Sequence, residues 1–339
     1  MAGDGDASPA SNPRPGRPSP GVPPSEYRRF EGKLSLLEER LFADAADGYW
    51  NDFSLLGAAL VASGVEDAQR LDYYENRVAA LADELKPLVV AKDPPRRQAQ
   101  AVFEFMHRRI LNGGYQLNST DLRLALDEGR FNCVSASVLF NCLASCFGLN
   151  TCGLEIPGHA MSRLLLAGET LDVETTYPNW FRLLGDPEKQ AVAVEKALGA
   201  FAGRAEKTGT DAAPNRVGSV EDVGDPSNLF PPSSLAVLPE GQRGISREPL
   251  PQGKREVSQW PLIRSQPVPP SPQARRVVTA VELVATIYYN RGVDLLDQGR
   301  FADALSANAK ALRLDPASTT ARGNLLATLN NWAITLGRE

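Results

Sequence analysis

Two residue types that carry much of enzyme chemistry are scarce in this sequence, whose 339 residues include only four cysteines and two histidines. No window offers the roughly 18 consecutive apolar residues that a membrane span needs, and the N-terminus lacks the apolar stretch of a signal peptide. The formal net charge of -5 gives no basic surface for nucleic acid. We therefore expect a cytoplasmic protein that binds neither a membrane nor nucleic acid.

The cysteines are also unevenly placed, because Cys133, Cys142, Cys146 and Cys152 all lie within twenty residues. Three of them fall in one predicted helix, where disulfides are geometrically poor. Their spacings of nine, four and six residues match no common zinc pattern. We expect free thiols in a reducing compartment, with no metal and no cofactor, and we place Cys142 and Cys146 in the core.

Two segments have the composition of chains that do not fold by themselves. Residues 1–25 consist mainly of Pro, Gly, Ser and Ala, so they bury too little apolar surface to offset the entropy of ordering. Residues 204–276 are rich in Pro, Gly, Ser and charged residues. We predict a disordered N-terminal arm and a long linker, in which the proline-rich residues 266–272 form a spacer or, alternatively, a polyproline ligand.

Residues 26–203 have the pattern of one domain that begins with helices. Between residues 26 and 112 apolar side chains recur at helical spacing, which predicts three to five packed helices. A short helix at 122–126 is expected to begin through residues 118–120. A second helix should run from about Cys133 to Phe147, ended by a glycine.

The pattern then changes from helical to strand-like. Short runs rich in β-formers are separated by turn residues, and Ala167-Gly168 joins the last two runs as a hairpin. Helices followed by antiparallel strands indicate an α+β fold. The predicted strands are residues 154–156, 159–166 and 170–176.

Helical periodicity returns in residues 277–339 with the spacing of a repeat. The characteristic positions are Tyr288, Gly292, Leu295, Gly299, Phe301, Ala304, Ala311 and Pro316. These offsets are those of one 34-residue tetratricopeptide (TPR) unit, and residues 324–336 supply one further helix. Since about three repeats are needed for independent stability, we expect this helical tail to dock onto the α+β domain.

The two histidines differ in their surroundings. His107 lies in the middle of a predicted helix, where we interpret it as a partly exposed structural residue. His159 follows a Pro-Gly pair at the start of a predicted strand. Cys133 lies in the first turn of a helix, where the dipole and the free N–H groups favour a thiolate. Cys133 and His159 are therefore the candidate nucleophile and base.

The strand after His159 supplies two candidates for the acid that orients the imidazole. In a strand, Asp172 and Glu174 share one face and the apolar residues between them share the other, so alternation does not choose between the acids. A hairpin loop of two or four residues would put both carboxylates on the face of His159, whereas a loop of three would put both on the other face. Both acids therefore stay candidates.

Three short motifs occur in the order Cys, His, acid: residues 129–135 (GRFNCVS), 157–159 (PGH) and 173–176 (VETT). In this order, with about fifteen residues between histidine and acid, they resemble the transglutaminase-like superfamily, in particular bacterial members with a helical N-terminal part and a TPR tail. The resemblance covers roughly residues 30–180 and 277–337. It implies a papain-like core.

The resemblance also implies roles for individual residues. Cys133 would be the nucleophile and His159 the base, and Glu174 occupies the position where the family usually has an aspartate. After a Gly-Gly pair, Tyr115 or Gln116 would lie near the oxyanion, as a side-chain donor does in papain-like enzymes. The alternative for these two residues is an ordinary polar turn.

These observations lead to two main functional hypotheses. In the first, the protein is a cysteine hydrolase or acyltransferase: Cys133 attacks an amide or ester carbonyl of a peptide or protein substrate, forms a thioester, and passes the acyl group to water or an amine. In the second, the core is a non-catalytic scaffold and the TPR tail recruits a protein partner. Regulatory oxidation of Cys133 is a third, for which a reactive thiol suffices.

Overall fold

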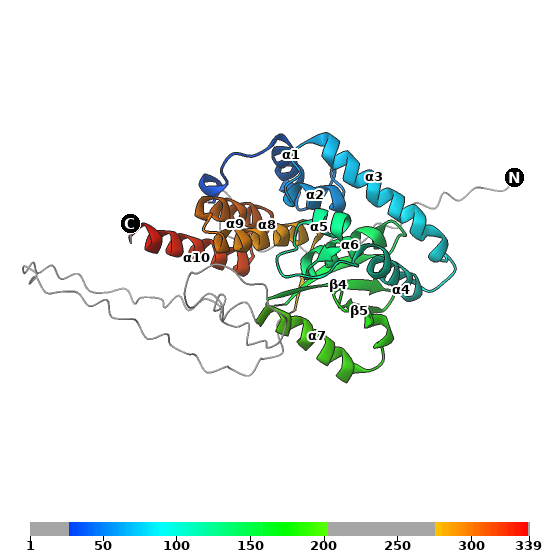
Figure 1. The fold of residues 1–339 in the computed structure, drawn as a ribbon. Helices are drawn as coiled ribbons and strands as arrows, with labels where there is room; N and C mark the ends of the chain where they lie inside the picture. The colour runs from blue at the N-terminus through cyan, green and yellow to red at the C-terminus, as the bar shows by residue number, and fades with distance from the viewer. Residues whose placement is uncertain (1–26, 157, 203–274, 338–339) are drawn as a thin grey trace, which may run out of the picture.

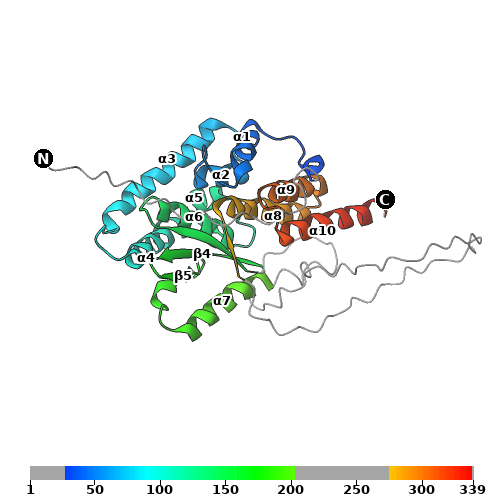
Figure 2. The same ribbon diagram turned by 180° about the vertical axis from the view of Figure 1, so that it is seen from behind.

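The computed structural model describes residues 27–156, 158–202 and 275–337, which fold into helices packed around one main antiparallel sheet (Figures 1 and 2). This combination agrees with the predicted α+β class. The predicted N-terminal arm, nearly all of the predicted linker and its proline-rich residues 266–272 lie outside the described residues. Among the described helices, none is long and apolar enough to cross a membrane.

Four α-helices form the N-terminal part, within the predicted range of three to five. Ser35, Ser54 and Asp67 cap three of them, because each side chain accepts a backbone N–H of the first turn. The fourth helix continues into a single π-helical turn, η5 (Met106–Ile110), which periodicity did not predict. The elements are η2 (Arg28–Phe30), α1 (Leu36–Asp44), η3 (Ala45–Asp47), α2 (Leu55–Ala62), α3 (Ala68–Leu85), η4 (Lys86–Leu88) and α4 (Pro95–Phe105).

The helix that carries Cys133 is buried on all sides. α6 (Cys133–Ser145) has only buried residues from its first position to Ala144, so it lies at the centre of the domain. The helix before it, α5 (Leu122–Glu128), is capped by Asp121 and not by the predicted residues 118–120. Two of those residues support α6 instead, because the Ser119 carbonyl and the Thr120 hydroxyl accept hydrogen bonds from the first turn of α6 and its cap.

A short parallel strand pair leads the chain into α6. β1 (Gly114–Tyr115) pairs with β2 (Arg130–Phe131), which places Tyr115 beside Phe131. The two segments approach closely just before the pair, where the Gly113 N–H donates to the Gly129 carbonyl at 2.9 Å. A Cβ atom on Gly113 would lie 2.1 Å from the Glu128 carbonyl oxygen, so only glycine fits there.

The main sheet has the strand order β5-β4-β3-β6. The turn between β4 and β5 has two residues, Ala167 and Gly168, as predicted. The predicted strand at 170–176 ends earlier, at Val173. In both views α6 and α7 lie on opposite sides of β4 and β5 (Figures 1 and 2). The elements are β3 (Thr151–Ile156), β4 (His159–Leu166), β5 (Glu169–Val173), η6 (Trp180–Arg182), α7 (Pro187–Ala202) and β6 (Arg276–Val278).

The C-terminal residues are joined to the rest of the molecule by a strand as well as by helices. β6 pairs with β3, so the predicted boundary between linker and tail, at residues 276 and 277, falls inside the main sheet. Three helices follow, and the first packs against α2, α6 and β3. The predicted docking of the tail is therefore seen in these contacts. The helices are α8 (Ala280–Asp297), α9 (Phe301–Leu314) and α10 (Thr319–Leu336).

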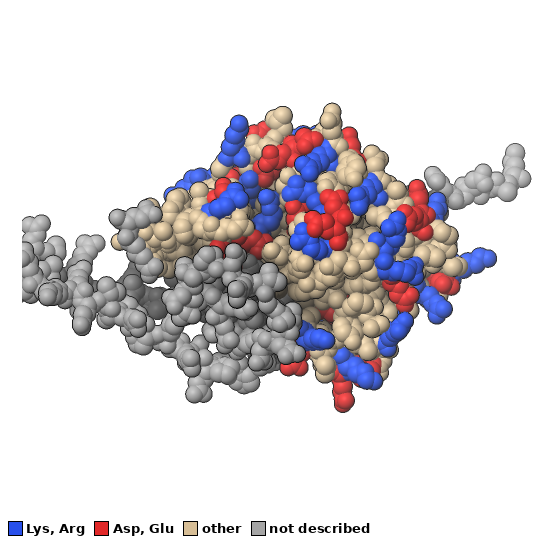
Figure 3. All heavy atoms as spheres, in the orientation of Figure 1, with Lys and Arg blue, Asp and Glu red and all other residues tan. Residues whose placement is uncertain are grey.

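Ion pairs add to this docking. Arg276 of β6 lies 3.3 Å from Glu155 of β3 and also pairs with Asp315, which follows α9. Breaking a largely buried pair leaves an uncompensated charge, so these contacts hold the tail against the sheet. On the face drawn in Figure 3, acidic and basic side chains of the described residues are interspersed. Two further pairs join α9 to the N-terminal segment: Lys310–Glu38 and Arg313–Glu31.

Candidate active site

Cys133 is the first residue of α6, and the chain before it is firmly held. The Asn132 side chain accepts the backbone N–H groups of Val134 and Ser135 at 3.0 and 3.1 Å. Its amide group donates to the Leu117 carbonyl at 3.0 Å. The thiol thus sits at a fixed helix N-terminus, where the helix dipole favours negative charge. Cys133 is only 2% exposed.

His159 is the first residue of β4 and follows the tight turn that joins β3 to β4. Gly158 makes this turn possible with a φ of 77°, which other residues rarely adopt. His159 pairs with Ile156 across the hairpin. Its Nε2 atom lies 2.6 Å from Oε2 of Glu174, and neither side chain is exposed to solvent. The structure therefore brings the predicted base and one of the two candidate acids together.

Glu174 is the first residue after β5, and local hydrogen bonds hold its side chain. Its Oε1 atom accepts the backbone N–H of Thr176 at 2.9 Å and the Thr176 hydroxyl at 2.6 Å. These local bonds compete with strand pairing, which explains why β5 ends at Val173. The last paired residues of β4 and β5 are Ser162 and Val173. Glu174 lies one residue beyond this pair and is a diagonal neighbour of His159, at a distance that a long side chain can span.

Asp172 takes a different place. It pairs across the hairpin with Arg163, four residues from His159 and thus about 13 Å along the strand. Its carboxylate accepts hydrogen bonds from Arg163 Nε at 2.6 Å and from Arg275 Nη1 at 2.6 Å. Of the two acids that the sequence left open, the structure places Glu174 at the imidazole and Asp172 in an arginine pair.

The charges around His159 favour its protonated form. Burial by itself opposes protonation, but the charges of Glu174 and Cys133, together with hydrogen bonds to both, outweigh burial and raise the pKa of His159 to about 10. Because Nε2 faces Glu174, the ring nitrogen that faces the thiol is Nδ1. At neutral pH the site therefore holds an imidazolium between a carboxylate and the Cys133 sulfur.

Tyr115, and not Gln116, lies at the thiol. Burial raises the pKa of Tyr115 well above its usual range, and the charges of Cys133 and Glu174 and a hydrogen bond to Cys133 act in the same direction. Among the described residues the hydroxyl has no partner of regular hydrogen-bond geometry, so its bond to the sulfur is loosely aligned. Gln116 is exposed, and its Oε1 atom accepts a bond from Arg130 at 3.1 Å. Of the two residues predicted near the oxyanion, Gln116 therefore does not lie at the thiol.

The closed state of the site leads to a first prediction. Cys133 is 2% exposed and His159 4% exposed, so iodoacetamide reaches the thiol only when the site opens locally. We expect Tyr115→Ala to speed alkylation of Cys133 about tenfold, which corresponds to lowering the free energy of this opening by about 1.4 kcal/mol. Mass spectrometry of each cysteine gives the rates. Tyr115→Phe, which keeps the ring, should react at nearly the wild-type rate. An unchanged rate in Tyr115→Ala would mean that another side chain limits access.

His107 is half-buried, as predicted, but it makes a contact that sequence reasoning missed. It lies in η5, and its Nε2 atom is 3.0 Å from the carbonyl oxygen of Thr175, which is 68 residues away in sequence. Its ring packs 4.6 Å from the ring of Phe103. Burial lowers the pKa of His107 to about 4, although the bond to Thr175 and the charge of Glu174 oppose this shift. The two histidines of the chain therefore carry different charges at neutral pH.

The remaining cysteines lie away from this arrangement. All four cysteines are free, with Cys142 buried and Cys146 exposed. Burial raises the pKa of the Cys142 thiol, which fits its predicted place in the core. The same prediction for Cys146 is wrong, because Cys146 is exposed. Within the described residues no group of His, Cys, Asp and Glu side chains is arranged to hold a metal ion.

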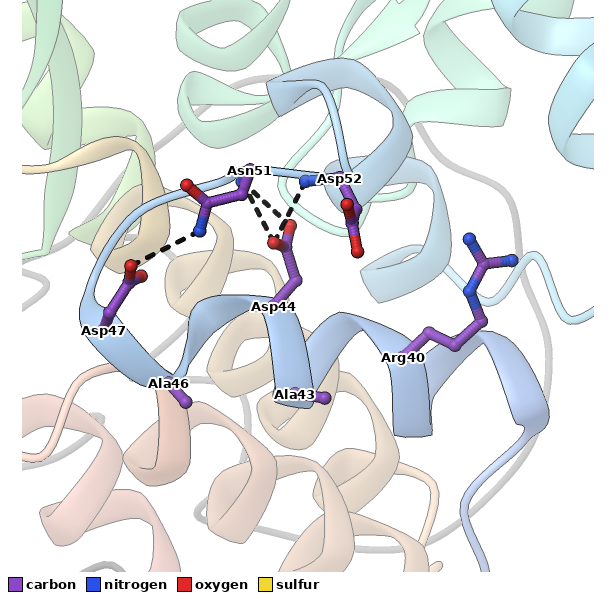
Figure 4. A pocket seen from close by; sticks show the side chains of 7 residues that line it. All are labelled: Arg40, Ala43, Asp44, Ala46, Asp47, Asn51 and Asp52. Atoms are coloured by element: carbon purple, nitrogen blue, oxygen red, sulfur yellow. Dashed lines mark hydrogen bonds between the residues drawn. The ribbon is translucent and has the colours of Figure 1, made fainter.

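A surface hollow lies beside α1 (Figure 4). Its acidic residues suggest a cation site, but the Asp44 carboxylate already accepts the backbone N–H groups of Asn51, Asp52 and Phe53. Asp44 therefore acts as a clamp for the loop between α1 and α2. The hollow is lined by Arg40, Ala43, Asp44, Ala46, Asp47, Asn51 and Asp52.

Comparison with models of protein families, with curated proteins and with solved structures finds no match for this chain.

Proposed function

We propose that this protein is a transglutaminase-like cysteine hydrolase or acyltransferase that acts on peptide or protein substrates. The observation that carries the proposal is the buried series Cys133, His159 and Glu174, in which Glu174 lies 2.6 Å from the imidazole. A cysteine at a helix N-terminus next to a histidine held by an acid has the parts that nucleophilic catalysis requires. In this proposal α6 with β3, β4 and β5 forms a papain-like core, and α8 to α10 form a TPR-like tail.

The chemistry follows from the charges. The Cys133 thiolate attacks the carbonyl carbon of an amide or ester, and the carbonyl oxygen takes up the negative charge. The backbone N–H of Cys133, in the first turn of α6, is the donor we expect at this oxyanion. His159 gives its Nδ1 proton to the leaving amine or alcohol as the tetrahedral intermediate breaks down to a thioester. Water or an amine then attacks the thioester, His159 takes its proton, and the thiolate leaves.

The proposal is tested by trapping the thioester. We expect a peptide with an activated C-terminal ester to acylate the protein at Cys133, with a mass increase equal to the acyl group and release by hydroxylamine. Cys133→Ser and His159→Ala should show no such adduct. If peptide esters and amides leave Cys133 unmodified while iodoacetamide still alkylates it selectively, the proposal of acyl transfer is wrong.

The second hypothesis, a non-catalytic scaffold, has one observation in its favour. The sulfur of Cys133 is nearly inaccessible in the described structure, as it would be in a core that no longer receives a substrate. The tail is less suited to free recruitment, because the side chains of α8 from Leu283 to Tyr289 are buried. Equal and slow alkylation of all four cysteines would favour the scaffold.

A further inference from the structure

One peptide group beside the candidate site is held from both sides. The carbonyl of Thr175 accepts a hydrogen bond from Nε2 of His107 at 3.0 Å. The N–H of the same peptide group, that of Thr176, donates to Oε1 of Glu174 at 2.9 Å. Because a peptide group is planar and its C=O and N–H point in opposite directions, a partner that holds the carbonyl also fixes the direction of the N–H.

The hydrogen bonds therefore form one series that ends at the imidazole. It runs from His107 to the peptide group, from there to Oε1 of Glu174, and from Oε2 of Glu174 to Nε2 of His159. We propose that His107 is a positioning residue, which holds Glu174 against His159 through this peptide group. His107 thereby maintains the imidazolium that faces Cys133. This proposal rests on the function proposed above.

The surroundings of Thr175 support this role. Its hydroxyl is 2.8 Å from the hydroxyl of Ser137, on the same helix as Cys133, and both residues are fully buried. The segment after β5 is thus fixed between η5 and α6, the elements that carry His107 and Cys133. A shift of this segment would move Glu174 relative to both the imidazole and the thiol, so its attachment points bear directly on the site.

The surroundings of His107 also favour a ring that donates a hydrogen bond from Nε2 to the Thr175 carbonyl. A carbonyl oxygen can only accept, so a neutral ring must carry its proton on Nε2. The ring is packed between Phe103 and Phe131, at centroid distances of 4.6 and 6.0 Å. It lies in a single π-helical turn, a feature that is frequent at functional sites. The ring contacts and the hydrogen bond together favour this orientation of the imidazole.

The proposal is tested with the full chain and two substitutions, His107→Phe and His107→Gln. With only two histidines in the sequence, ¹⁵N NMR of labelled histidine follows the protonation of His159 without overlap. We expect His107→Phe, which fills the same space without a donor, to lower the pKa of His159 by about one unit. His107→Gln should restore the wild-type pKa, because its amide can donate to Thr175.

Tyr74→Phe is the matched control. It removes one side-chain hydrogen bond, from the Tyr74 hydroxyl to Asp127 at 2.7 Å, so it should change stability but leave the titration of His159 as it is. A folded His107→Phe with the wild-type titration of His159 would overturn the proposal, as would a failure of glutamine to restore it. If His107→Phe does not fold, His107→Met makes the same comparison.

The result separates this proposal from the function on which it rests. A wild-type protein whose His159 is neutral at pH 7 would contradict the imidazolium in both. A protonated His159 that is insensitive to His107 would overturn the positioning role alone and leave the proposed chemistry standing.

Discussion

Glu174→Gln is expected to slow alkylation of Cys133 by iodoacetamide at pH 7 by about a hundredfold or more, the cost of removing one partner from a buried ion pair. The carboxylate of Glu174 lies 2.6 Å from the imidazole, and both side chains are shielded from solvent. Without that charge the pKa of His159 falls, because burial still opposes protonation and only Cys133 still favours it. A neutral imidazole no longer stabilises a thiolate, so Cys133 becomes a poorly reactive buried thiol.

Mass spectrometry of all four cysteines gives the rate at each, and the exposed Cys146 serves as the internal reference. Asp172→Asn is the matched control, because it removes a carboxylate two residues away that binds Arg163 and Arg275 instead. We expect its rate at Cys133 to stay within about twofold of the wild type, since the carboxylate lies opposite Arg163, four residues along the strand from His159. Equal effects of the two substitutions would show that Glu174 has no special role.

The comparison of the two acids also shows where sequence reasoning reached its limit. The alternation of apolar and acidic residues predicts one strand over residues 171–176, in which the side chains of Asp172 and Glu174 lie on the same face. The structure ends the strand at Val173, because the N–H and hydroxyl of Thr176 bind the Glu174 side chain. A local side-chain hydrogen bond of this kind leaves no periodic signal. The choice of acid stayed open until the register was known, in which Asp172 faces Arg163 and Glu174 lies one residue beyond the last pair.

Elements with long patterns were the easiest to predict. The N-terminal helices, α6 and the two-residue turn of the β4–β5 hairpin agree with the sequence, since each rests on several apolar positions or a clear turn signal. The three-residue strand β6 and the two-residue strand β1 have no pattern of their own. The sequence left Tyr115 and Gln116 open for this reason, because a strand of two residues does not show which neighbouring side chain points inward.

The position of His107 was a harder case. The contact with Thr175 joins residues 68 apart in sequence, and it depends on how η5 packs against the segment after β5. A histidine in the middle of a helical pattern is more often structural, and nothing in its neighbours indicates a partner. Only the packed structure brings His107 to the peptide group that holds Glu174.

The second prediction with a large expected effect concerns His107 and acid. Its pKa in the folded protein is about 4, against an ordinary value of 6.5, because burial disfavours the charged ring. Between these two pH values the unfolded chain binds a proton at this position that the folded protein does not bind. The stability that this histidine contributes is thus present above pH 6.5 and is lost as the pH falls toward 4, by about 3 kcal/mol in total.

We expect His107→Gln to be spared this loss, because the amide keeps the donor to Thr175 and does not titrate. Urea unfolding of both proteins at a series of pH values gives the difference in their free energies of unfolding. Carboxylates contribute equally to the two proteins and cancel in that difference. His159 does not interfere, because its raised pKa of about 10 leaves it protonated in the folded protein throughout this window, as it largely is in the unfolded chain. Parallel curves for the two proteins would mean that the His107 ring is accessible to water and protonates normally in the folded state.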